Sequence, residues 1–394
     1  MPPTGRRPNA GLVPKSTGDD FLDLDDFLSL RDIERAGKTR LSVAAEGYYS
    51  SGADDGDAAA DNLACFRRIR LVPRMLRDVG NVDVSTTLFG TRLDCPVVVA
   101  PMAMQRMATP EGELATARAS AAAGVPMCLS TMATADLREV SASVQGMEDS
   151  ALWFQLYVLR DRDFCAHMIR EAQTLGYRAL VVTVDAPVLG NREADHRNRF
   201  TLPEGLRLKN LERLQRYAGA GIADTSEGSG LSALFKQQLD PSLTWETLLP
   251  WLRSVTTLPI LVKGILHPDD ARLALRHGVD GIIVSNHGGR QLGCAVAAAD
   301  VLPAIARVVQ RRVPVLVDGG VRRGTDVLKC LAMGADAVML GRPVLWGLAC
   351  GGEAGAAKVL AILRHELRTA MALCGCATLG DITPDLLLHA GARL

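Results

Sequence analysis

One short loop of the sequence combines a histidine, two glycines and an arginine, a set that suits acid–base chemistry on a carboxylic acid. The loop reads Ser285-Asn286-His287-Gly288-Gly289-Arg290-Gln291-Leu292 and follows an apolar run from Gly281 to Val284. An imidazole can take a proton near neutral pH, and a nearby guanidinium can hold a carboxylate through paired hydrogen bonds. Because glycine lacks a Cβ atom, the backbone can approach a ligand closely. The loop could therefore grip an α-hydroxy acid and deprotonate its alcohol.

His287 is the best candidate for a base among the seven histidines. The other six fall in helical patterns, in a long loop, before a helix or in the C-terminal tail, where structural or solvated roles are expected. Asp185 closes another apolar run and could hold an imidazolium form, as carboxylates do beside catalytic histidines. No His, Cys and acidic residues have the spacing of metal ligands, so we expect no metal.

These side chains need a scaffold, and eight short apolar runs from about residue 96 predict one. The runs are Pro96–Ala100, Val125–Leu129, Leu152–Tyr157, Ala179–Val184, Pro259–Val262, Gly281–Val284, Val313–Val317 and Ala337–Leu340. They lack polar alternation, as strands covered on both faces do, and helical patterns with glycine stops separate most of them. No dinucleotide-binding glycine motif follows the first run. We therefore expect an α/β fold, a (β/α)₈ TIM barrel.

The barrel is expected to carry an extension before its first strand and a long connection after its fourth strand. Residues 1–20 are typical of a disordered tail, and one domain is expected over 21–394, with a helical extension before the barrel. The connection from Ala186 to about Thr244 is much longer than a usual βα loop, which is typical of lids and binding loops. Its middle, Gly219 to Gly230, is polar and rich in small residues, which predicts mobility rather than membrane insertion.

Polar residues follow seven of the eight runs. In chain order they are Ser130, Gln155 and Tyr157, Thr183 and Asp185, Lys263, Ser285 and His287, Asp318, and Arg342. The carboxyl ends of barrel strands meet at one mouth, which favours a single functional site. Gly319-Gly320 with Arg322, and Gly341-Arg342, suit the phosphate site that recurs after the last two strands of such barrels. Lys263 could form a Schiff base, face an electron-rich cofactor atom, or lie at the surface.

Composition excludes several kinds of partner. The 44 basic and 44 acidic residues cancel, so neither nucleic acid nor an anionic membrane is indicated. No apolar run reaches the ~20 residues of a spanning helix. The nine cysteines lie mostly in apolar runs, which predicts buried thiols in an intracellular protein. Ala392-Arg393-Leu394 is close to the Ser-Lys-Leu address, so we expect the peroxisome, with the cytoplasm as the alternative.

Taken together, these motifs resemble those of the FMN-dependent L-2-hydroxy acid oxidase and dehydrogenase family, above all its peroxisomal glycolate and 2-hydroxyacid oxidases. The resemblance covers about Phe21 to Leu394. It rests on Ser-Asn-His-Gly-Gly-Arg-Gln, Asp-Gly-Gly-Val-Arg-Arg-Gly-Thr-Asp, Phe-Gln-Leu-Tyr-Val, Asn-Arg-Glu-Ala-Asp and Tyr-Tyr-Ser-Ser-Gly-Ala. It implies FMN as cofactor and an (S)-2-hydroxy-acid oxidase that converts glycolate, L-lactate or somewhat longer acids to 2-oxo acids, with O₂ reduced to H₂O₂. It also implies a homo-oligomer, commonly a tetramer.

The resemblance further implies a role for each matching residue. The expected flavin contacts are Pro101, Met102 and Ala103 behind the ring, Ser130, Gln155 and Thr183 at its edges, Lys263 at its N1/O2 edge, and Ser285, Asp318, Gly320, Arg322, Gly341 and Arg342 along the ribityl chain and phosphate. The expected substrate contacts are Tyr48, Arg192 and Arg290 on the carboxylate and Tyr157 on the hydroxyl, with His287 as the base and Asp185 as its partner. The position of Lys263 beside the flavin removes the Schiff-base reading.

Three positions depart from the family pattern. Met132 stands where glycolate-type members often have an aromatic residue, and Met102 where they have threonine. Flexible thioethers adapt to different shapes, so we expect a roomier substrate pocket that favours lactate or longer acids. Gly293 replaces a usual aspartate, with no evident consequence from the sequence. A dehydrogenase with a non-oxygen acceptor, a mandelate-type aromatic oxidase and a flavin-binding barrel without redox chemistry remain as alternatives.

Overall fold

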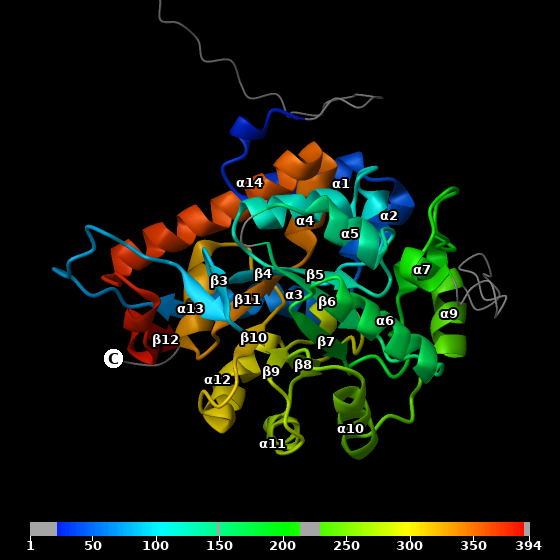
Figure 1. Ribbon diagram of the computed structural model, residues 1–394. Helices are drawn as coiled ribbons and strands as arrows, with labels where there is room; N and C mark the ends of the chain where they lie inside the picture. Colours follow the sequence, from blue (N-terminus) through cyan, green and yellow to red (C-terminus); the bar gives the residue numbers. More distant parts are fainter. Residues whose placement is uncertain (1–21, 148–149, 213–228, 390–394) are drawn as a thin grey trace, which may run out of the picture.

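The computed structural model describes residues 22–147, 150–212 and 229–389, and its central feature is a closed barrel of eight parallel strands (Figure 1). In chain order the barrel strands are β4 (Val97–Val99), β5 (Met127–Ser130), β6 (Leu152–Leu156), β7 (Ala179–Thr183), β8 (Ile260–Ile265), β9 (Gly281–Val284), β10 (Val315–Val317) and β11 (Ala337–Leu340). Each pairs with its neighbours in sequence, and β11 closes on β4. The predicted (β/α)₈ barrel is confirmed.

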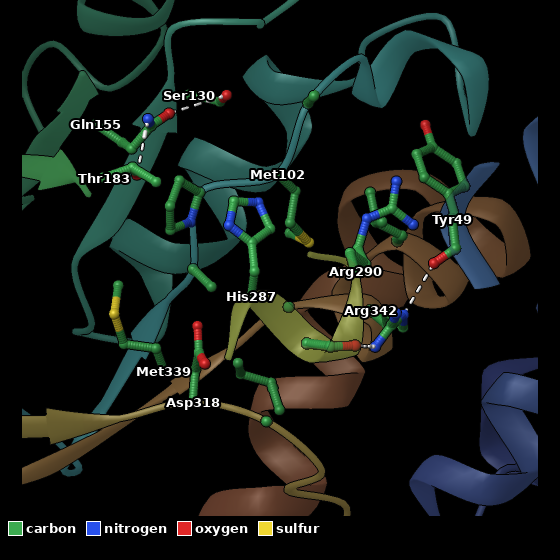
Figure 2. Close-up of a pocket in the computed structure, with 18 of the residues that line it drawn as sticks. Tyr49, Met102, Ser130, Gln155, Thr183, His287, Arg290, Asp318, Met339 and Arg342 are labelled. Carbon is green, nitrogen blue, oxygen red and sulfur yellow. Dashed lines mark hydrogen bonds between the residues drawn. The ribbon is translucent and has the colours of Figure 1, made fainter. Parts of the chain in front are cut away.

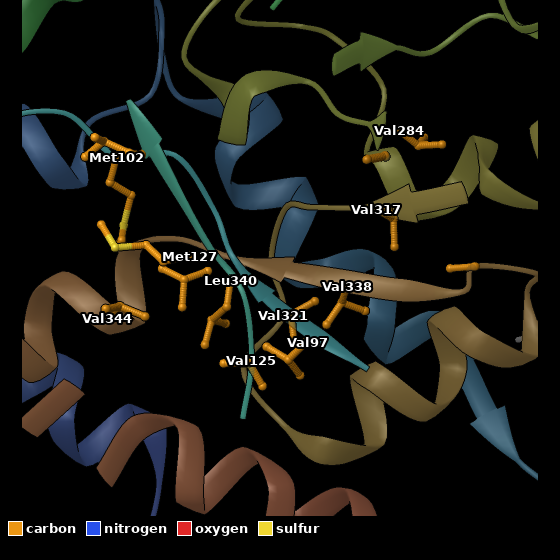
Figure 3. Packing of buried hydrophobic residues seen from close by; sticks show 14 of the residues in the cluster. Val97, Met102, Val125, Met127, Val284, Val317, Val321, Val338, Leu340 and Val344 are labelled. Carbon is orange, nitrogen blue, oxygen red and sulfur yellow. The ribbon is translucent and has the colours of Figure 1, made fainter. Parts of the chain in front are cut away.

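Alternate residues of the strands build two separate cores. Val98, Trp153 and Leu261 belong to the cluster inside the barrel, and their neighbours in sequence belong to the larger cluster under the helices. Figure 3 shows outward side chains of β4 and β11, such as Val97 and Leu340, packed near the helices. Since both faces of each strand are covered, an apolar run without polar alternation is the expected pattern.

Helices follow most of the strands and cover the barrel. They are α4 (Glu113–Ala122), α5 (Leu137–Ser143), α6 (Arg162–Thr174), α10 (Trp245–Val255), α11 (Pro268–Arg276), α12 (Ala298–Val309), α13 (Gly324–Ala332) and α14 (Arg342–Cys374). Among the described helices, only α14 is long and apolar enough to cross a membrane by length and composition, and 72% of the relevant window is buried inside the protein. Gly351 and Gly352 leave helical geometry within it. The burial marks α14 as a core helix.

The segment before the barrel is helical, as predicted, and also closes the barrel floor. It contains η1 (Leu24–Asp26), α1 (Leu30–Arg40), α2 (Val43–Ser50), α3 (Asp57–Ala64), η2 (Cys65–Arg68), and the strands β1 (Ile69–Leu71), β2 (Thr86–Leu88) and β3 (Thr91–Leu93). Leu88 and Leu93 of the β2–β3 hairpin join the core inside the barrel, and Phe89 packs edge-on against Trp153 with ring centroids 5.7 Å apart. This hairpin was not predicted from the sequence.

The long connection after β7 is partly helical. It contains α7 (Glu193–Arg197), η4 (Lys209–Leu211) and α9 (Gly230–Gln238), and most of the stretch expected to be mobile lies outside the described residues. The expected tail over residues 1–20 lies outside them too. Short 3₁₀ turns and a last strand complete the chain: η3 (Gln105–Met107), η5 (His287–Gly289), η6 (Leu379–Asp381), η7 (Pro384–Leu386) and β12 (Leu387–His389), which pairs with β1. All nine cysteines are free, and only Cys294 is exposed.

Candidate active site

A cavity of about 1070 Å³ opens at the carboxyl ends of the barrel strands. It is lined by every predicted site residue except two, Asp185 and Ser285, which lie behind its wall. Figure 2 shows side chains from distant parts of the chain, such as Met102, Thr183 and Arg342, turned toward this space. The barrel therefore brings the predicted residues together.

His287, Asp185 and Tyr157 form a hydrogen-bonded row. The Nδ1 atom of His287 lies 2.8 Å from Oδ1 of Asp185, and its Nε2 atom lies 3.2 Å from the Tyr157 hydroxyl. A carboxylate at Nδ1 favours the tautomer with the proton on Nδ1, which leaves the lone pair on Nε2. Tyr157 and His287 line the cavity, whereas Asp185 does not. With that tautomer the Tyr157 hydroxyl donates to the Nε2 lone pair, and both groups line the space where a ligand would bind.

The electrostatic setting keeps His287 neutral and Asp185 ionised. Burial lowers the pKa of His287, and although the Asp185 carboxylate opposes this, Lys263 and Arg192 add to it. Burial alone would raise the pKa of Asp185, but His287 and Lys263 lower it below the ordinary value. Burial raises the pKa of Tyr157 above its usual value, so the phenol stays protonated. At neutral pH the row contains a base that is ready to accept a proton.

The backbone of His287 is strained and held in place by buried amides. Its φ angle is 58°, a conformation that costs a non-glycine residue energy and is often retained at functional sites. The Ser285 hydroxyl accepts the His287 N–H at 3.0 Å, and the Asn286 side chain accepts the Gly289 N–H at 3.0 Å. Asn62 of α3 exchanges two hydrogen bonds, of 2.8 and 3.0 Å, with the Asn286 amide. Sequence reasoning missed Asn62, because its partner lies 224 residues away.

Gly264 makes room for Asp185. Its φ angle is 117°, and a Cβ atom there would lie 2.5 Å from the Cβ atom of Asp185. The predicted strand ended at Val262, but β8 continues to Ile265 with a register shift between Lys263 and Ile265. Lys263 therefore lies within the strand rather than at its end. The irregularity at Gly264 lets β8 and the Asp185 carboxylate come close together. It was not predicted from the sequence.

Two arginines beside the histidine lack a carboxylate partner among the described residues. Arg192 is buried, and its hydrogen bonds to other described residues are long, 3.4 Å to the Arg290 carbonyl and 3.4 Å to the Gln291 side chain. Burial and the neighbouring Arg290 lower the pKa of Arg192 to about 10. Arg290 binds the Tyr48 and Ser51 carbonyls and lies 4.8 Å over the Tyr48 ring. A ligand carboxylate would relieve this crowding of positive charge.

A chain of small polar groups crosses the ends of β5, β6 and β7. The Gln155 amide donates to the Thr183 hydroxyl at 3.0 Å and accepts from the Ser130 hydroxyl at 3.2 Å (Figure 2). These groups are almost fully buried and line the cavity. Amide and hydroxyl groups can both donate and accept, as the edge of a flavin's pyrimidine ring requires.

Lys263 is held by a serine and an aspartate on neighbouring strands. Its ammonium donates to the Ser285 hydroxyl at 2.8 Å and pairs with Asp318 at 3.1 Å. Burial opposes its charge, but Asp318 and Asp185 raise its pKa overall. Ser285 was expected at the ribityl chain, yet it is fully buried below Lys263 and does not line the cavity. In this structure Ser285 positions Lys263 and His287.

The opposite end of the cavity fits a phosphate and a polyol. Arg342 is half-buried and donates to the carbonyls of Tyr49, Gly288 and Ser51, each at 2.9 to 3.0 Å (Figure 2). Burial and nearby cations lower its pKa to about 9. The Asp318 Oδ1 atom is buried without a hydrogen-bond partner among the described residues. Arg342 has no ion pair within the described residues, so it suits a phosphate. The unpaired oxygen of Asp318 suits a hydroxyl group that donates a hydrogen bond. The residues present therefore fit FMN.

Apolar side chains form the wall beside the base. Met132 and Met102 were predicted here, and the structure adds Leu231 and Phe235 of α9, with Phe235 edge-on to Tyr157 at 5.5 Å between ring centroids. Sequence reasoning missed these two because they lie in the long connection after β7. Gly293 also gains an explanation: a Cβ atom there would lie 2.3 Å from the Asp54 carboxylate, which occupies that space. Within the described residues, no three His, Cys or acidic side chains gather as a metal site.

Comparisons with known proteins agree with this site. A family model described as FMN-dependent dehydrogenase matches residues 37–389. The chain is 49% identical over 360 residues to an L-lactate oxidase of Nostoc sp., covering 91% of this chain and 98% of that protein. It is 47% identical to the glycolate oxidase of Spinacia oleracea, with 91% and 95% covered. A solved structure of mandelate oxidase with (S)-4-hydroxymandelic acid is similar, with a TM-score of 0.84, 40% identity and 92% and 98% covered.

Proposed function

Because this chain belongs to the family of FMN-dependent dehydrogenases and FMN is its cofactor, we propose that it is an (S)-2-hydroxy-acid oxidase. It would convert short L-2-hydroxy acids to 2-oxo acids and pass the electrons to O₂, giving H₂O₂. The observation that carries the proposal is the neutral His287, held by Asp185 at 2.8 Å, facing a cavity that is also lined by arginines.

Each side chain of the hydrogen-bonded row His287, Asp185 and Tyr157 would have its own task. His287 would take the proton of the substrate hydroxyl at Nε2, and Asp185 would stabilise the imidazolium that forms. Tyr157, which bonds the same nitrogen at 3.2 Å, would hydrogen-bond the substrate oxygen. Bound FMN supplies the two-electron acceptor for the substrate's α-carbon. Lys263, buried and cationic, would stabilise negative charge on that acceptor.

The substrate clamp consists of Arg192, Arg290 and Tyr48. All three line the cavity beside His287, and neither arginine forms an ion pair within the described residues, although the Asp195 carboxylate acts on both through its charge. A bidentate arginine fixes both the position and the plane of a carboxylate, which orients the α-carbon for reaction. A lysine in the place of either arginine would be a poor substitute.

The substrate is proposed to carry a side chain larger than that of glycolate. Met132, Leu231 and Phe235 would surround it, and a thioether adapts to several shapes. This wall supports L-lactate or somewhat longer acids. An aromatic 2-hydroxy acid is the second candidate, supported by the similarity to mandelate oxidase structures and by the edge-on ring of Phe235.

A panel of 2-hydroxy acids would test cofactor, substrate and acceptor together. Glycolate, L-lactate, L-2-hydroxybutyrate, L-mandelate and D-lactate would be added to the yellow protein without oxygen, and flavin bleaching would be followed. L-lactate or L-2-hydroxybutyrate should bleach fastest and D-lactate should not react. Admission of air should restore the colour with one H₂O₂ per 2-oxo acid. Bleaching that only a dye reverses would indicate a dehydrogenase with a non-oxygen acceptor, and no bleaching with any acid would overturn the proposal.

Location and assembly are proposals of the same kind. We propose peroxisomal import through Ala392-Arg393-Leu394, which lie outside the described residues, and a homo-oligomer. Deleting these three residues should move a fluorescent fusion from peroxisomes to the cytoplasm. Light scattering of the purified protein would measure the number of subunits, and a monomer would contradict the proposed assembly.

A further inference from the structure

A second, strongly basic hollow lies next to the phosphate end of the active site. It has a volume of about 1420 Å³ and is bordered by α1, by the η2–β1 segment and by the start of α13. Gly320 and Arg322 belong to its wall and to the wall of the active-site cavity. Figure 1 shows α1 and α13 as separate parts of the chain on the outside of the barrel. The hollow is therefore distinct from the flavin site but shares a boundary with it.

The lining of this hollow has an excess of positive charge, whereas the whole chain has no net charge. Its lining contains six cationic side chains and two carboxylates, whereas the whole chain has 44 of each sign. Both carboxylates have internal partners. Glu34 binds Lys38 at 2.8 Å and Arg322 at 3.3 Å, and Asp326 accepts the Arg322 and Arg323 backbone N–H groups, each at 3.0 Å. Neither forms an ion pair with Arg31, Arg67 or Arg70.

Three of the cations are exposed and have no ion pair among the described residues: Arg31, Arg67 and Arg70. A fourth, Lys329, donates to the Phe66 carbonyl at 2.8 Å. Burial lowers the pKa of Lys329, and Arg70 lowers it further although Asp326 opposes both. Like charges gathered around a solvent-filled space produce a positive potential that attracts anions. This group of cations is therefore suited to bind a negatively charged ligand.

We propose that this hollow binds a small anion that carries two or more phosphate groups. A guanidinium matches a phosphate through two parallel hydrogen bonds, and three guanidinium groups without an ion pair, from three elements, exceed what a single phosphate needs. Four apolar residues also line the hollow, but its three guanidinium groups without an ion pair favour phosphates rather than an aromatic group as the main contacts. This binding site is separate from the oxidase activity proposed above. Because Arg322 lines both cavities, an anion bound in the hollow would act on the flavin phosphate through Arg322.

Calorimetric titration of the FMN-loaded protein with tripolyphosphate, at constant ionic strength, tests the proposal. We expect saturable binding of one anion per chain and at least tenfold weaker binding of sulfate. Replacing Arg31, Arg67 and Arg70 together by glutamate should weaken tripolyphosphate binding at least tenfold. Arg35→Glu is the control for a single reversal such as Arg31→Glu, because both make the same charge change on an exposed residue of α1 and only Arg31 lines the hollow. This control should bind as the unaltered protein does. The single variant Arg67→Gln, expected to weaken binding severalfold, serves if the triple variant loses its flavin.

Three results would overturn the inference. No saturable binding would exclude the site. Equal weakening by Arg31→Glu and Arg35→Glu would show that only the net charge of the protein matters. Binding confined to the FMN-free protein, and displaced by FMN, would place the anion in the flavin phosphate site. None of these measurements uses turnover, so they remain interpretable whether or not the proposed oxidase activity is found.

Discussion

At the scale of single residues, the proposed chemistry depends on the hydrogen bond that Asp185 makes with one nitrogen of His287. The 2.8 Å contact at Nδ1 leaves Nε2 as the acceptor, and burial keeps the ring neutral. The base is therefore prepared before any substrate arrives. Glutamine in place of His287 would keep a side chain of similar length but could not take up the proton.

We accordingly predict that His287→Gln retains FMN and slows anaerobic flavin bleaching by about 10²–10⁴-fold, the usual contribution of a general base. His167→Gln is the control, because His167 is an exposed histidine of α6. It should bleach at the unaltered rate. A His287→Gln protein that kept most of its bleaching rate would show that another group removes the proton.

The acid side of the pH profile tests the partner of the base. Because the pKa of His287 is lowered from 6.5, kcat/KM should be constant near neutral pH and fall tenfold per pH unit only below the lowered pKa. Asp185 raises the pKa of His287, so Asp185→Asn should move this fall to still lower pH. The same change should reduce kcat by about 10²–10⁴-fold, since the proton would no longer be fixed on Nδ1. A fall that moved to higher pH would contradict the pairing.

At the scale of elements, the irregularity in β8 decides whether Asp185 can reach His287. Gly264→Ala should lower the free energy of unfolding by more than about 2 kcal/mol, because the residue has a φ of 117° and its new Cβ would meet Asp185 at 2.5 Å. Gly278→Ala is the matched control, with a φ of 72° and nothing within 4 Å. It should cost about 1–2 kcal/mol. Urea unfolding measures both, and equal losses would show that the contact with Asp185 is unimportant.

The elements themselves were largely predictable, whereas the contacts between distant ones were not. Each of the eight strands appears within a few residues of its apolar run, since burial on both faces leaves a local signal. The β2–β3 hairpin carries no such signal, and its role depends on contact with Trp153. Asn62 was missed for a similar reason, because only the folded chain brings it to Asn286. Ser285 was expected at the ribityl chain from the sequence, whereas in the folded chain its hydroxyl accepts a hydrogen bond from Lys263.

At the scale of the whole molecule, a chain with no net charge places five cations around the active-site cavity. Arg192, Arg290, Arg322, Arg342 and Lys263 all line it, while the numbers of acidic and basic residues are equal overall. Burial lowers the pKa of Arg192 to about 10 and that of Arg342 to about 9, which means that the folded protein disfavours their charged forms. The barrel without ligands stores unfavourable electrostatic energy at its mouth. Anionic ligands should therefore stabilise the whole fold.

Removal of FMN should consequently lower the melting temperature, and the phosphate should account for much of the difference. At 100 times its Kd, a ligand of the folded state adds about 2.7 kcal/mol of stability. Riboflavin has the same ring and ribityl chain but no phosphate, so at equal concentration it should restore much less stability than FMN. Arg342→Met should reduce the advantage of FMN over riboflavin, because the cation at the phosphate end is gone. Scanning calorimetry of the four combinations would measure this. If riboflavin and FMN stabilised the unaltered protein equally, the phosphate end would lie elsewhere and Arg342 would be a purely structural residue that holds the Tyr49, Ser51 and Gly288 carbonyls together.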